Sequence, residues 1–338
     1  MGFLKTIANP DVFQAAIPQV PMGKYAHFVL LRESNSFPLF QTDQQLNFAR
    51  VSAGLIDSHL LSRIVIFKRK QTTPERLTGR ELLRRYGVTS DEPNAANYCE
   101  YNSERFCKVC PDCIYYGFAI GSEGSERSKV LVDSAFSLSD YDESHQTMTF
   151  NAPYEHGTMS KEGQTRSSFG EQDHVLPQVF FPTVITVRDP TEAEFIYVLN
   201  NILRTKRYGA QTTRTGSLEN HLVAVVFADG EIFSNLKLTQ TLYDSLEEKK
   251  GPFVATNLIP KMETAIPALL QEDRVVSMVI VGEPLTAMVN EVGALVSNEG
   301  RLREVLQQAF AESKRYAETF GSKAGDKKGK GKTKAVEA

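Results

Sequence analysis

The chain has 338 residues, and its 38 lysine and arginine residues against 41 aspartate and glutamate residues give a formal net charge of −3. Hydrophobic residues make up 41% and charged residues 23%, as in an ordinary globular protein with a sizeable core. No apolar stretch approaches the roughly 20 residues that cross a bilayer, and no secretory signal opens the chain. We therefore expect a cytoplasmic protein without membrane contact, in which the local distribution of charge indicates the partners.

The amino-terminal part of the chain predicts two strands and a helix. The apolar run at 25–31 (YAHFVLL) predicts a buried strand, which a polar loop containing Asp43 follows. The run at 61–67 (LSRIVIF) predicts a second strand. A helix is then expected to begin at Pro74 or Glu75 and to end near Gly87.

The middle of the chain is less regular. The segment 114–121 (IYYGFAIG) predicts another strand. The segment 136–169 is poor in aliphatic residues and rich in polar ones, which predicts a mobile insertion or a long hairpin.

Regular structure is expected again after this polar segment. The run 179–187 predicts a strand, and Thr191 with Glu194 forms the pattern of a capping box at the start of a helix. The apolar residues of that helix share one face, and Gly209 is the expected cap at its end.

The carboxyl-terminal part predicts strands at 221–227 and 275–281, a short helix at 236–246 and a helix whose apolar face runs from 302 to 310. The lysine- and glycine-rich tail 321–338 is expected to be disordered. Strands and helices alternate with long interruptions, which favours an α+β fold over a doubly wound parallel sheet.

All four cysteines lie close together, at Cys99, Cys107, Cys110 and Cys113. Thiolates separated by two residues on a turn reach one metal ion, so CKVC and CPDC predict a metal site with Cys99 as the fourth ligand. We expect a closed structural Zn²⁺ site that holds an insertion too small to have a core of its own.

Three other interpretations of the cysteines stay open. An iron–sulfur cluster uses similar spacings, although its proline follows the last cysteine, whereas Pro111 does not. Four free core thiols are the plainest alternative. In the last interpretation a histidine replaces one cysteine ligand, the candidates being His145, His156 and His174.

Two basic segments are candidates for phosphate binding. The first, 63–85, has eight basic residues against two acidic ones, a net charge of +6. In the second, 204–216, arginines, hydroxyls and two glycines occur together after a helix, and Tyr208 is a candidate for stacking on a base. The alternative is that each segment is the solvated face of a helix.

No common catalytic motif occurs in the chain. There is no Walker loop, dinucleotide fingerprint, H-E-x-x-H or G-x-S-x-G. We therefore expect a protein that is not an enzyme.

A resemblance to a known family is carried by two segments and by the cysteine cluster between them. The segments are FVLLRESNSFPLFQ (28–41) and FFPTVITVRDPTEAEFIYVLNNILRTKRYGAQTTRTGSLENHL (180–222). Over about residues 15–320 the chain resembles the backbone subunit of the type I-D CRISPR interference complex, a branch of the Cas-seven group of repeat-associated RNA-binding proteins.

The resemblance implies a single ferredoxin-like (RRM-like) core domain over 1–320 with two insertions. One, at about 70–130, carries the metal site, and the other, at about 136–174, includes a thumb-like hairpin at 140–172. Copies are expected to stack as a helical homo-oligomer along the CRISPR RNA, with other subunits of the complex. The guide then pairs with target DNA, or with target RNA, so base pairing supplies the specificity.

We expect the RNA-binding residues in the two basic segments and on one neighbouring strand. They are Arg50, Lys68, Arg69, Lys70, Arg204, Lys206, Arg207, Tyr208, Gly209, Gln211, Thr213 and Arg214.

Two alternatives to this function remain. Type III relatives cut target RNA with a loop aspartate, and Asp43 occupies such a loop. In the second alternative, the chain is a zinc-bearing module that binds a protein partner through its cysteine region.

Overall fold

A computed structural model of the protein describes residues 2–43, 45–121, 124–150, 160–161, 164–165 and 170–321. The elements are η1 (Pro10–Val12), β1 (Tyr25–Ser34), β2 (Gln41–Thr42), β3 (Gln45–Leu46), β4 (Phe48–Ser52), β5 (Leu60–Ile66), α1 (Lys68–Arg85), α2 (Pro111–Tyr115), β6 (Phe118–Ile120), β7 (Gly124–Glu126), β8 (Val130–Val132), β9 (Ala135–Phe136), α3 (Tyr141–Ser144), β10 (His145–Phe150), β11 (Ser160–Lys161), β12 (Gln164–Thr165), β13 (Gly170–Val175), β14 (Phe180–Arg188), α4 (Glu192–Arg204), β15 (Leu218–Ala228), α5 (Asn235–Asp244), α6 (Ala255–Asp273), β16 (Ser277–Ile280), α7 (Gly282–Ser297) and α8 (Glu299–Phe320).

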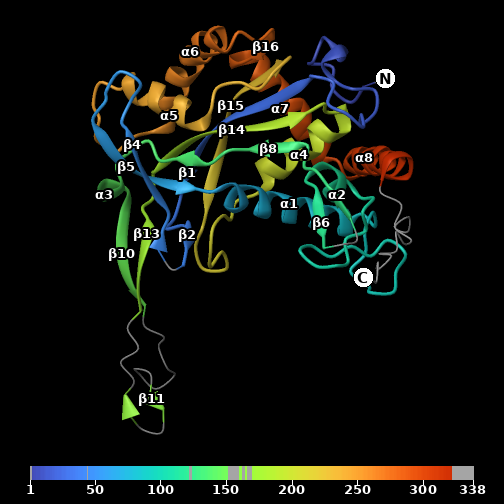
Figure 1. Ribbon diagram of the computed structural model, residues 1–338, viewed down its shortest axis with the longest axis horizontal. Coiled ribbons are helices and arrows are strands. Elements are labelled where there is room, and N and C mark those ends of the chain that lie inside the picture. Colours follow the sequence, from blue (N-terminus) through green and yellow to red (C-terminus); the bar gives the residue numbers. More distant parts are fainter. Residues whose placement is uncertain are drawn as a thin grey trace, which may run out of the picture.

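The centre of the molecule is a five-stranded antiparallel sheet in the order β16, β15, β1, β14, β8. β1 lies in the middle, and its apolar residues alternate between two cores because successive side chains of a strand point to opposite faces. Phe28 and Leu30 pack into the core under α1, α4, α7 and α8. Val29 and Leu31 pack into the core under α5 and α6. Figure 1 shows α5 and α6 on one side of the sheet and α1 on the other.

The α+β prediction is confirmed, since helices and strands both occur at length and the sheet is antiparallel. The predicted buried strands at 25–31 and 179–187 are confirmed as β1 and β14. Both strands are buried along nearly their whole length, which is why they appear in the sequence as continuous apolar runs.

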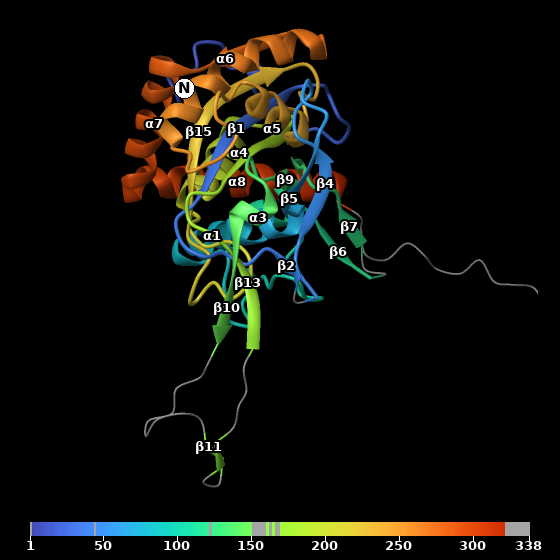
Figure 2. The same ribbon diagram turned by 90° about the vertical axis from the view of Figure 1, so that its left-hand side faces the viewer.

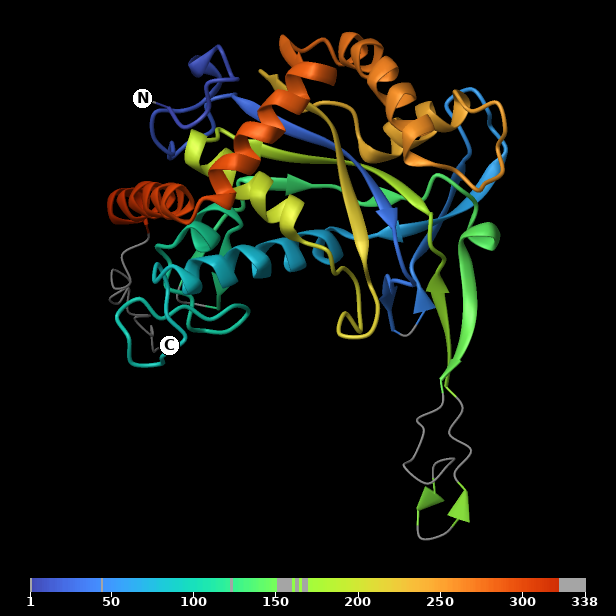
Figure 3. The same ribbon diagram turned by 180° about the vertical axis from the view of Figure 1, so that it is seen from behind.

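α1 and α4 pack side by side beneath the sheet, as Figure 3 shows from behind. Gly79 permits their close approach, because a Cβ atom there would lie 2.4 Å from Asn201 Nδ2 and from Tyr197 Oη. α1 begins at Lys68, so the prediction of a start at Pro74 or Glu75 is wrong. Its first turn forms directly after β5, where the Lys70 amide donates to the Phe67 carbonyl at 2.8 Å.

A long hairpin leaves the body of the protein in all three overall views, as Figure 2 shows most clearly. Its described part pairs β10 with β13, from His145 opposite Val175 to Phe150 opposite Gly170, and β11 pairs with β12 further out. The hairpin alternative for the polar segment is thus confirmed for these strands. The prediction of mobility there falls largely on 151–159, 162–163 and 166–169, which lie outside the described residues.

Two other predictions about local structure are wrong. In 114–121 the first residues belong to α2, and only Phe118–Ile120 is a strand, because Gly117 with φ +76° separates the two. α4 ends at Arg204 and is capped by Thr205, whose amide donates to the Asn201 carbonyl. Gly209 therefore lies in the following loop and is not the helix cap.

The carboxyl-terminal third is more helical than expected. The predicted helices at 236–246 and 302–310 are confirmed as α5 and α8, and the strand at 275–281 as β16. α6 and α7 were not predicted. The tail after Gly321 lies outside the described residues. Among the residues that are described, no helix combines the length and the apolar character needed to cross a membrane.

Candidate metal centre and nucleic-acid interface

The four cysteine sulfurs lie within 4.8 Å of one another, so the metal site predicted from their spacing has a matching geometry. Cys99 Sγ is 3.9 Å from Cys110 Sγ and 3.7 Å from Cys113 Sγ, and Cys107 Sγ is 3.8 Å from Cys113 Sγ. Four sulfurs at about 2.3 Å from one tetrahedral ion are about 3.8 Å apart. The arrangement is therefore compatible with a single metal ion.

The histidine alternative finds no support in the described residues. The only group of possible ligands found there consists of the four cysteines. His145 and His174 lie on β10 and β13, at the base of the hairpin. His156 lies outside the described residues.

Two arginines of α1 hold the cysteine site against the rest of the domain. Arg80 donates to Cys99 Sγ at 3.4 Å, to the Cys99 carbonyl at 2.7 Å and to Asp112 at 2.7 Å. Arg76 donates to both oxygens of the buried Asp112 carboxylate, through Nε to Oδ1 and through Nη2 to Oδ2, each at 2.9 Å. The neighbouring thiols, and to a lesser degree Arg80, lower the pKa of Cys99, whereas the pKa values of Cys110 and Cys113 are raised by neighbouring thiols and by burial.

The cysteine site belongs to the main core. Cys99, Cys110 and Cys113 are buried with residues of α4 and α8 in the same hydrophobic cluster. Tyr115, two residues after the last cysteine, packs edge-on against Tyr197 of α4 and donates to the Ala309 carbonyl of α8 at 3.3 Å. The cysteine cluster is therefore packed against α4 and α8 as part of the main core.

Three of the arginines that made segment 63–85 basic are structural. Arg63 is fully buried and donates to the carbonyls of Ser137 and Ala53, each at 2.6 Å. Arg76 and Arg80 are engaged by Asp112. The net charge of +6 therefore overstates what this segment presents to a ligand. Lys68 and Arg69 are exposed and Lys70 is partly exposed at the start of α1.

An open groove of about 680 Å³ brings the two predicted basic segments together. Lys68, Arg69 and Lys70 line it on one side, and Gly209 lines it on the other. Phe67, the N-cap residue of α1, makes no side-chain capping bond there. The positive end of a helix with adjacent basic side chains favours phosphate groups. The strand-turn residues Gln41, Thr42 and Asp43 also line this groove.

The loop that carries Gly209 is held tightly at the groove. Gly209 has φ +86°, and an added Cβ atom would lie 2.4 Å from the Leu39 carbonyl oxygen. The Ala210 amide donates to that same carbonyl at 2.9 Å. Only glycine permits this close backbone approach without strain.

Tyr208 is fully buried, and the expectation that it stacks on a base is wrong for this conformation. Its hydroxyl donates to Glu75 at 3.1 Å and accepts from Asn220 at 2.8 Å. The Arg32 guanidinium lies 4.9 Å from the centre of its ring. Tyr208 thus anchors the loop beneath the groove.

A chain of three glutamines connects the groove to the hairpin. Gln211 of the loop donates to Gln172 of β13 at 3.0 Å, and Gln172 donates to Gln41 of β2. Gln41 and Gln172 could not be recognised in advance, because isolated glutamines form no recognisable motif. Their contacts place the base of the hairpin directly beside the groove.

The remaining predicted RNA-binding residues lie around these elements. Arg50 is exposed on β4 opposite Ser62. Arg204 donates to the Val296 carbonyl, which directs its side chain toward α7. The predicted RNA-binding residues in or just before the Gly209 loop all have exposed or partly exposed side chains, namely Lys206, Arg207, Gln211, Thr213 and Arg214.

Asp43, the candidate for RNA cleavage, lies in the turn between β2 and β3 with φ +53° and lines the groove. Within the described part of the chain, no group of three or more possible metal ligands includes it.

Comparison with known proteins identifies the family. The family model described as Csc2 Crispr matches residues 12–306. No match is found among curated proteins. The crystal structure of Thermofilum pendens Csc2 has a similar fold, with a TM-score of 0.63 and 15% identity over 95% of this chain and 99% of that one. A chain of a CRISPR RNA-guided surveillance complex in a pre-nicking state gives a TM-score of 0.52 and 11% identity over 81% of this chain and 99% of that one. Since the family model covers most of its length, the chain belongs to the Csc2 family of CRISPR proteins.

Proposed function

We propose that this protein is the non-catalytic backbone subunit of a type I-D CRISPR interference complex, which acts in antiviral defence in the cytoplasm. Copies stack as a helical homo-oligomer along a CRISPR RNA beside the other subunits, and the RNA is presented for pairing with target DNA. Membership of the Csc2 family supports the CRISPR role. The observation that carries RNA binding is the groove between Lys68–Lys70 and the Gly209 loop.

The core is proposed to be ferredoxin-like, in a single domain over 1–320. Such a core has the order strand, helix, strand, strand, helix, strand, with the sheet order 4-1-3-2. Assigning β1, α1, β8, β14, α4 and β15 to these six elements reproduces that order, because the sheet runs β15, β1, β14, β8. Both β10–β13 and the cysteine region are then insertions between elements of the core.

The guide strand is proposed to cross the groove with its phosphates against Lys68, Arg69 and Lys70. The Gly209 loop lets a sugar-phosphate backbone approach the main chain closely. The hairpin of β10 and β13 begins at the same place, through the contact of Gln172 with Gln211. It is therefore positioned to act as a thumb that interrupts the base stack of the guide.

The cysteine site is proposed to hold a structural Zn²⁺. Zinc accepts four thiolates in a closed tetrahedron, and such a site has no open position for a reacting molecule. An iron–sulfur cluster binds its cysteines through different iron atoms, which requires sulfurs further apart than those around one ion. The sulfur separations of 3.7–3.9 Å favour the single ion.

The groove is tested by the triple variant Lys68→Ala, Arg69→Ala, Lys70→Ala. Each phosphate contact on a single strand contributes about 0.7 to the slope of log K against log salt, so three lost contacts weaken binding about 100-fold at 0.1 M salt. The slope itself falls by about 2. Fluorescence anisotropy with a labelled 20-nucleotide single-stranded RNA measures both quantities.

The matched control removes three positive charges from α8 with the triple variant Arg301→Ala, Arg303→Ala, Lys314→Ala. These side chains are about half exposed and form ion pairs with neighbours on their own helix, and the Arg303 guanidinium also lies 5.3 Å from the centre of the Tyr86 ring. The control is expected to retain nearly the full affinity. Equal affinity and equal salt slope in the two triple variants would show that the guide does not use the groove.

A further inference from the structure

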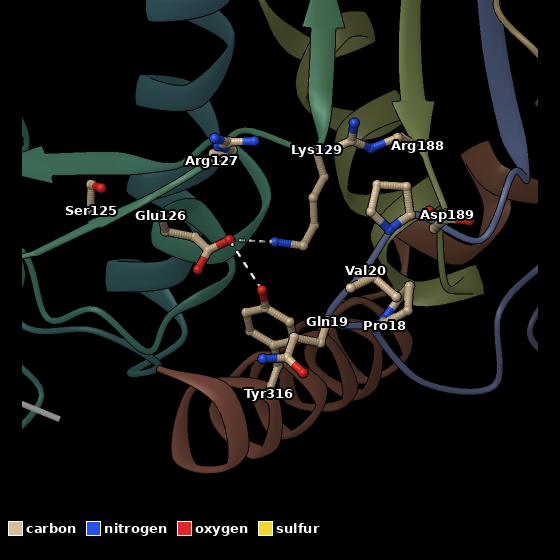
Figure 4. Close-up of a pocket in the computed structure, with 11 residues that line it drawn as sticks. Pro18, Gln19, Val20, Ser125, Glu126, Arg127, Lys129, Arg188, Asp189 and Tyr316 are labelled. Atoms are coloured by element: carbon tan, nitrogen blue, oxygen red, sulfur yellow. Dashed lines mark hydrogen bonds and ion pairs between the residues drawn. The ribbon is translucent and has the colours of Figure 1, made fainter. Parts of the chain in front are cut away.

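A second pocket lies at the opposite end of the central sheet from the groove. It has a volume of about 290 Å³ and lies between the amino-terminal segment, the end of β14 and α8. Figure 4 shows Arg127, Lys129 and Arg188 along one side of it, with Glu126, Asp189 and Tyr316 nearby. The pocket is therefore lined by three cationic and two anionic side chains.

Both carboxylates of the pocket are already engaged by other groups. Asp189 accepts hydrogen bonds from the Met22 amide at 2.9 Å, the Lys24 amide at 3.1 Å and Gln14 Nε2 at 3.1 Å. It thereby fixes the amino-terminal segment to the end of β14.

Glu126 accepts from Lys129 Nζ at 3.0 Å and from the Tyr316 hydroxyl at 3.2 Å (Figure 4). Lys129 is buried and also donates to the Ile114 carbonyl at 3.1 Å. The charge of Lys129 is thus balanced within the protein.

Unlike the other charged residues of the pocket, Arg127 and Arg188 have side chains without partners among the described residues. Across the described residues, neither guanidinium takes part in a hydrogen bond, an ion pair or a contact with an aromatic ring. Both line the same pocket, and the Arg188 amide donates to the carbonyl of Lys129, two residues after Arg127, at 2.9 Å. Arg127 is exposed and Arg188 is partly exposed, so both are open to a ligand.

We infer that this pocket binds a phosphate group through Arg127 and Arg188. A planar guanidinium offers paired N–H donors that match phosphate oxygens, and two unpaired arginines at one concave site supply the charge of a phosphate ligand. The phosphate belongs either to a nucleic-acid strand or to a free nucleotide. We expect the strand, because the proposed function already brings RNA to this protein.

The pocket is separate from the groove. Tyr25 at the start of β1 is opposite Arg188, whereas the groove lies beyond the end of β1, around Gln41. The two sites are closer than the length of β1, because Lys129 of the pocket and Ser134 of the groove flank β8 and are five residues apart, at most about 18 Å. Each subunit would therefore hold phosphate at two separate points.

The test uses the full-length double variant Arg127→Gln, Arg188→Gln, in the wild-type chain and in the groove triple variant. Loss of two phosphate contacts weakens binding of a labelled 20-nucleotide single-stranded RNA about 25-fold at 0.1 M salt and lowers the salt slope by about 1.4. AMP binding is measured in parallel by calorimetry. The control is the double variant Arg301→Gln, Arg303→Gln on α8, and equal thermal midpoints verify folding.

The outcomes are distinct. Weaker RNA binding in both backgrounds supports a pocket that contacts a nucleic-acid strand, even if the groove variant itself has no effect. Unchanged RNA binding with loss of AMP binding supports a pocket for a free nucleotide. If the double variant and its control bind both RNA and AMP equally, the pocket does not bind phosphate and the inference is overturned.

Discussion

Replacing Cys113 with serine is expected to abolish metal binding and to lower the thermal unfolding midpoint by at least about 5 °C. Cys113 is fully buried, and its sulfur lies between those of Cys99 and Cys107. Removing one thiolate opens the tetrahedron, and the remaining ligands then hold the ion weakly. Because the site packs into the main core, a loss of about 3 kcal/mol or more follows, at roughly 2 °C per kcal/mol for a chain of this size.

Two measurements check this expectation. Metal analysis should give one zinc and no iron per wild-type chain, and none in the variant. A chelator should lower the midpoint of the wild type and leave that of Cys113→Ser unchanged. Glu104→Gln, an exposed substitution in the same segment, is the matched control and should behave as the wild type. Wild-type protein that is stable and free of metal would refute the assignment of the site.

Replacing Glu75 with glutamine is expected to destabilise the protein by about 3–5 kcal/mol. Arg32 and Glu75 are both fully buried, and Arg32 Nη2 donates to Glu75 Oε1 at 2.7 Å. The neutral amide removes the charge that compensates Arg32 where no water reaches it. The change also weakens the acceptor for Tyr208, so the groove loop should lose order. Urea denaturation measures the free energy of unfolding.

The paired substitution Arg32→Met, Glu75→Leu shows whether Glu75→Gln destabilises the protein by leaving the Arg32 charge uncompensated or by disturbing side-chain packing. Buried ion pairs are often replaced by apolar residues at little cost, since neither charge then needs compensation. This variant is expected to be more stable than Glu75→Gln alone. A Glu75→Gln variant that unfolds at the same urea concentration as the wild type would show that the ion pair contributes nothing to stability.

The features that were predicted correctly have local causes in the chain. β1 and β14 are buried on both faces, so each appears as an apolar run. The cysteine spacing predicted that the four sulfurs come together because the cysteines lie close to one another along the chain. The cap of α4 is likewise local, since the Thr191 hydroxyl accepts from the Glu194 amide three residues later.

The features that were missed depend on contacts between distant segments. Whether an arginine faces a ligand or a buried carboxylate is set by its tertiary partner, as with Arg80 and Asp112, which are 32 residues apart. Tyr208 is buried because it meets Glu75, 133 residues away. α6 was missed for another reason. It contains Pro260 and Pro267, and the low helix propensity of proline predicts that a helix does not run through these positions.

The most direct test of an RNA-binding backbone subunit is to purify the protein from cells that express a CRISPR RNA, with no nucleic acid added later. Absorbance, nuclease treatment and extraction then show what the protein retains, and size-exclusion chromatography gives its oligomeric state. The proposed function predicts an oligomer that protects RNA of uniform length, and loss of that RNA in the Lys68–Lys70 triple variant. A monomer without RNA, which also fails to bind added single-stranded RNA, would contradict it.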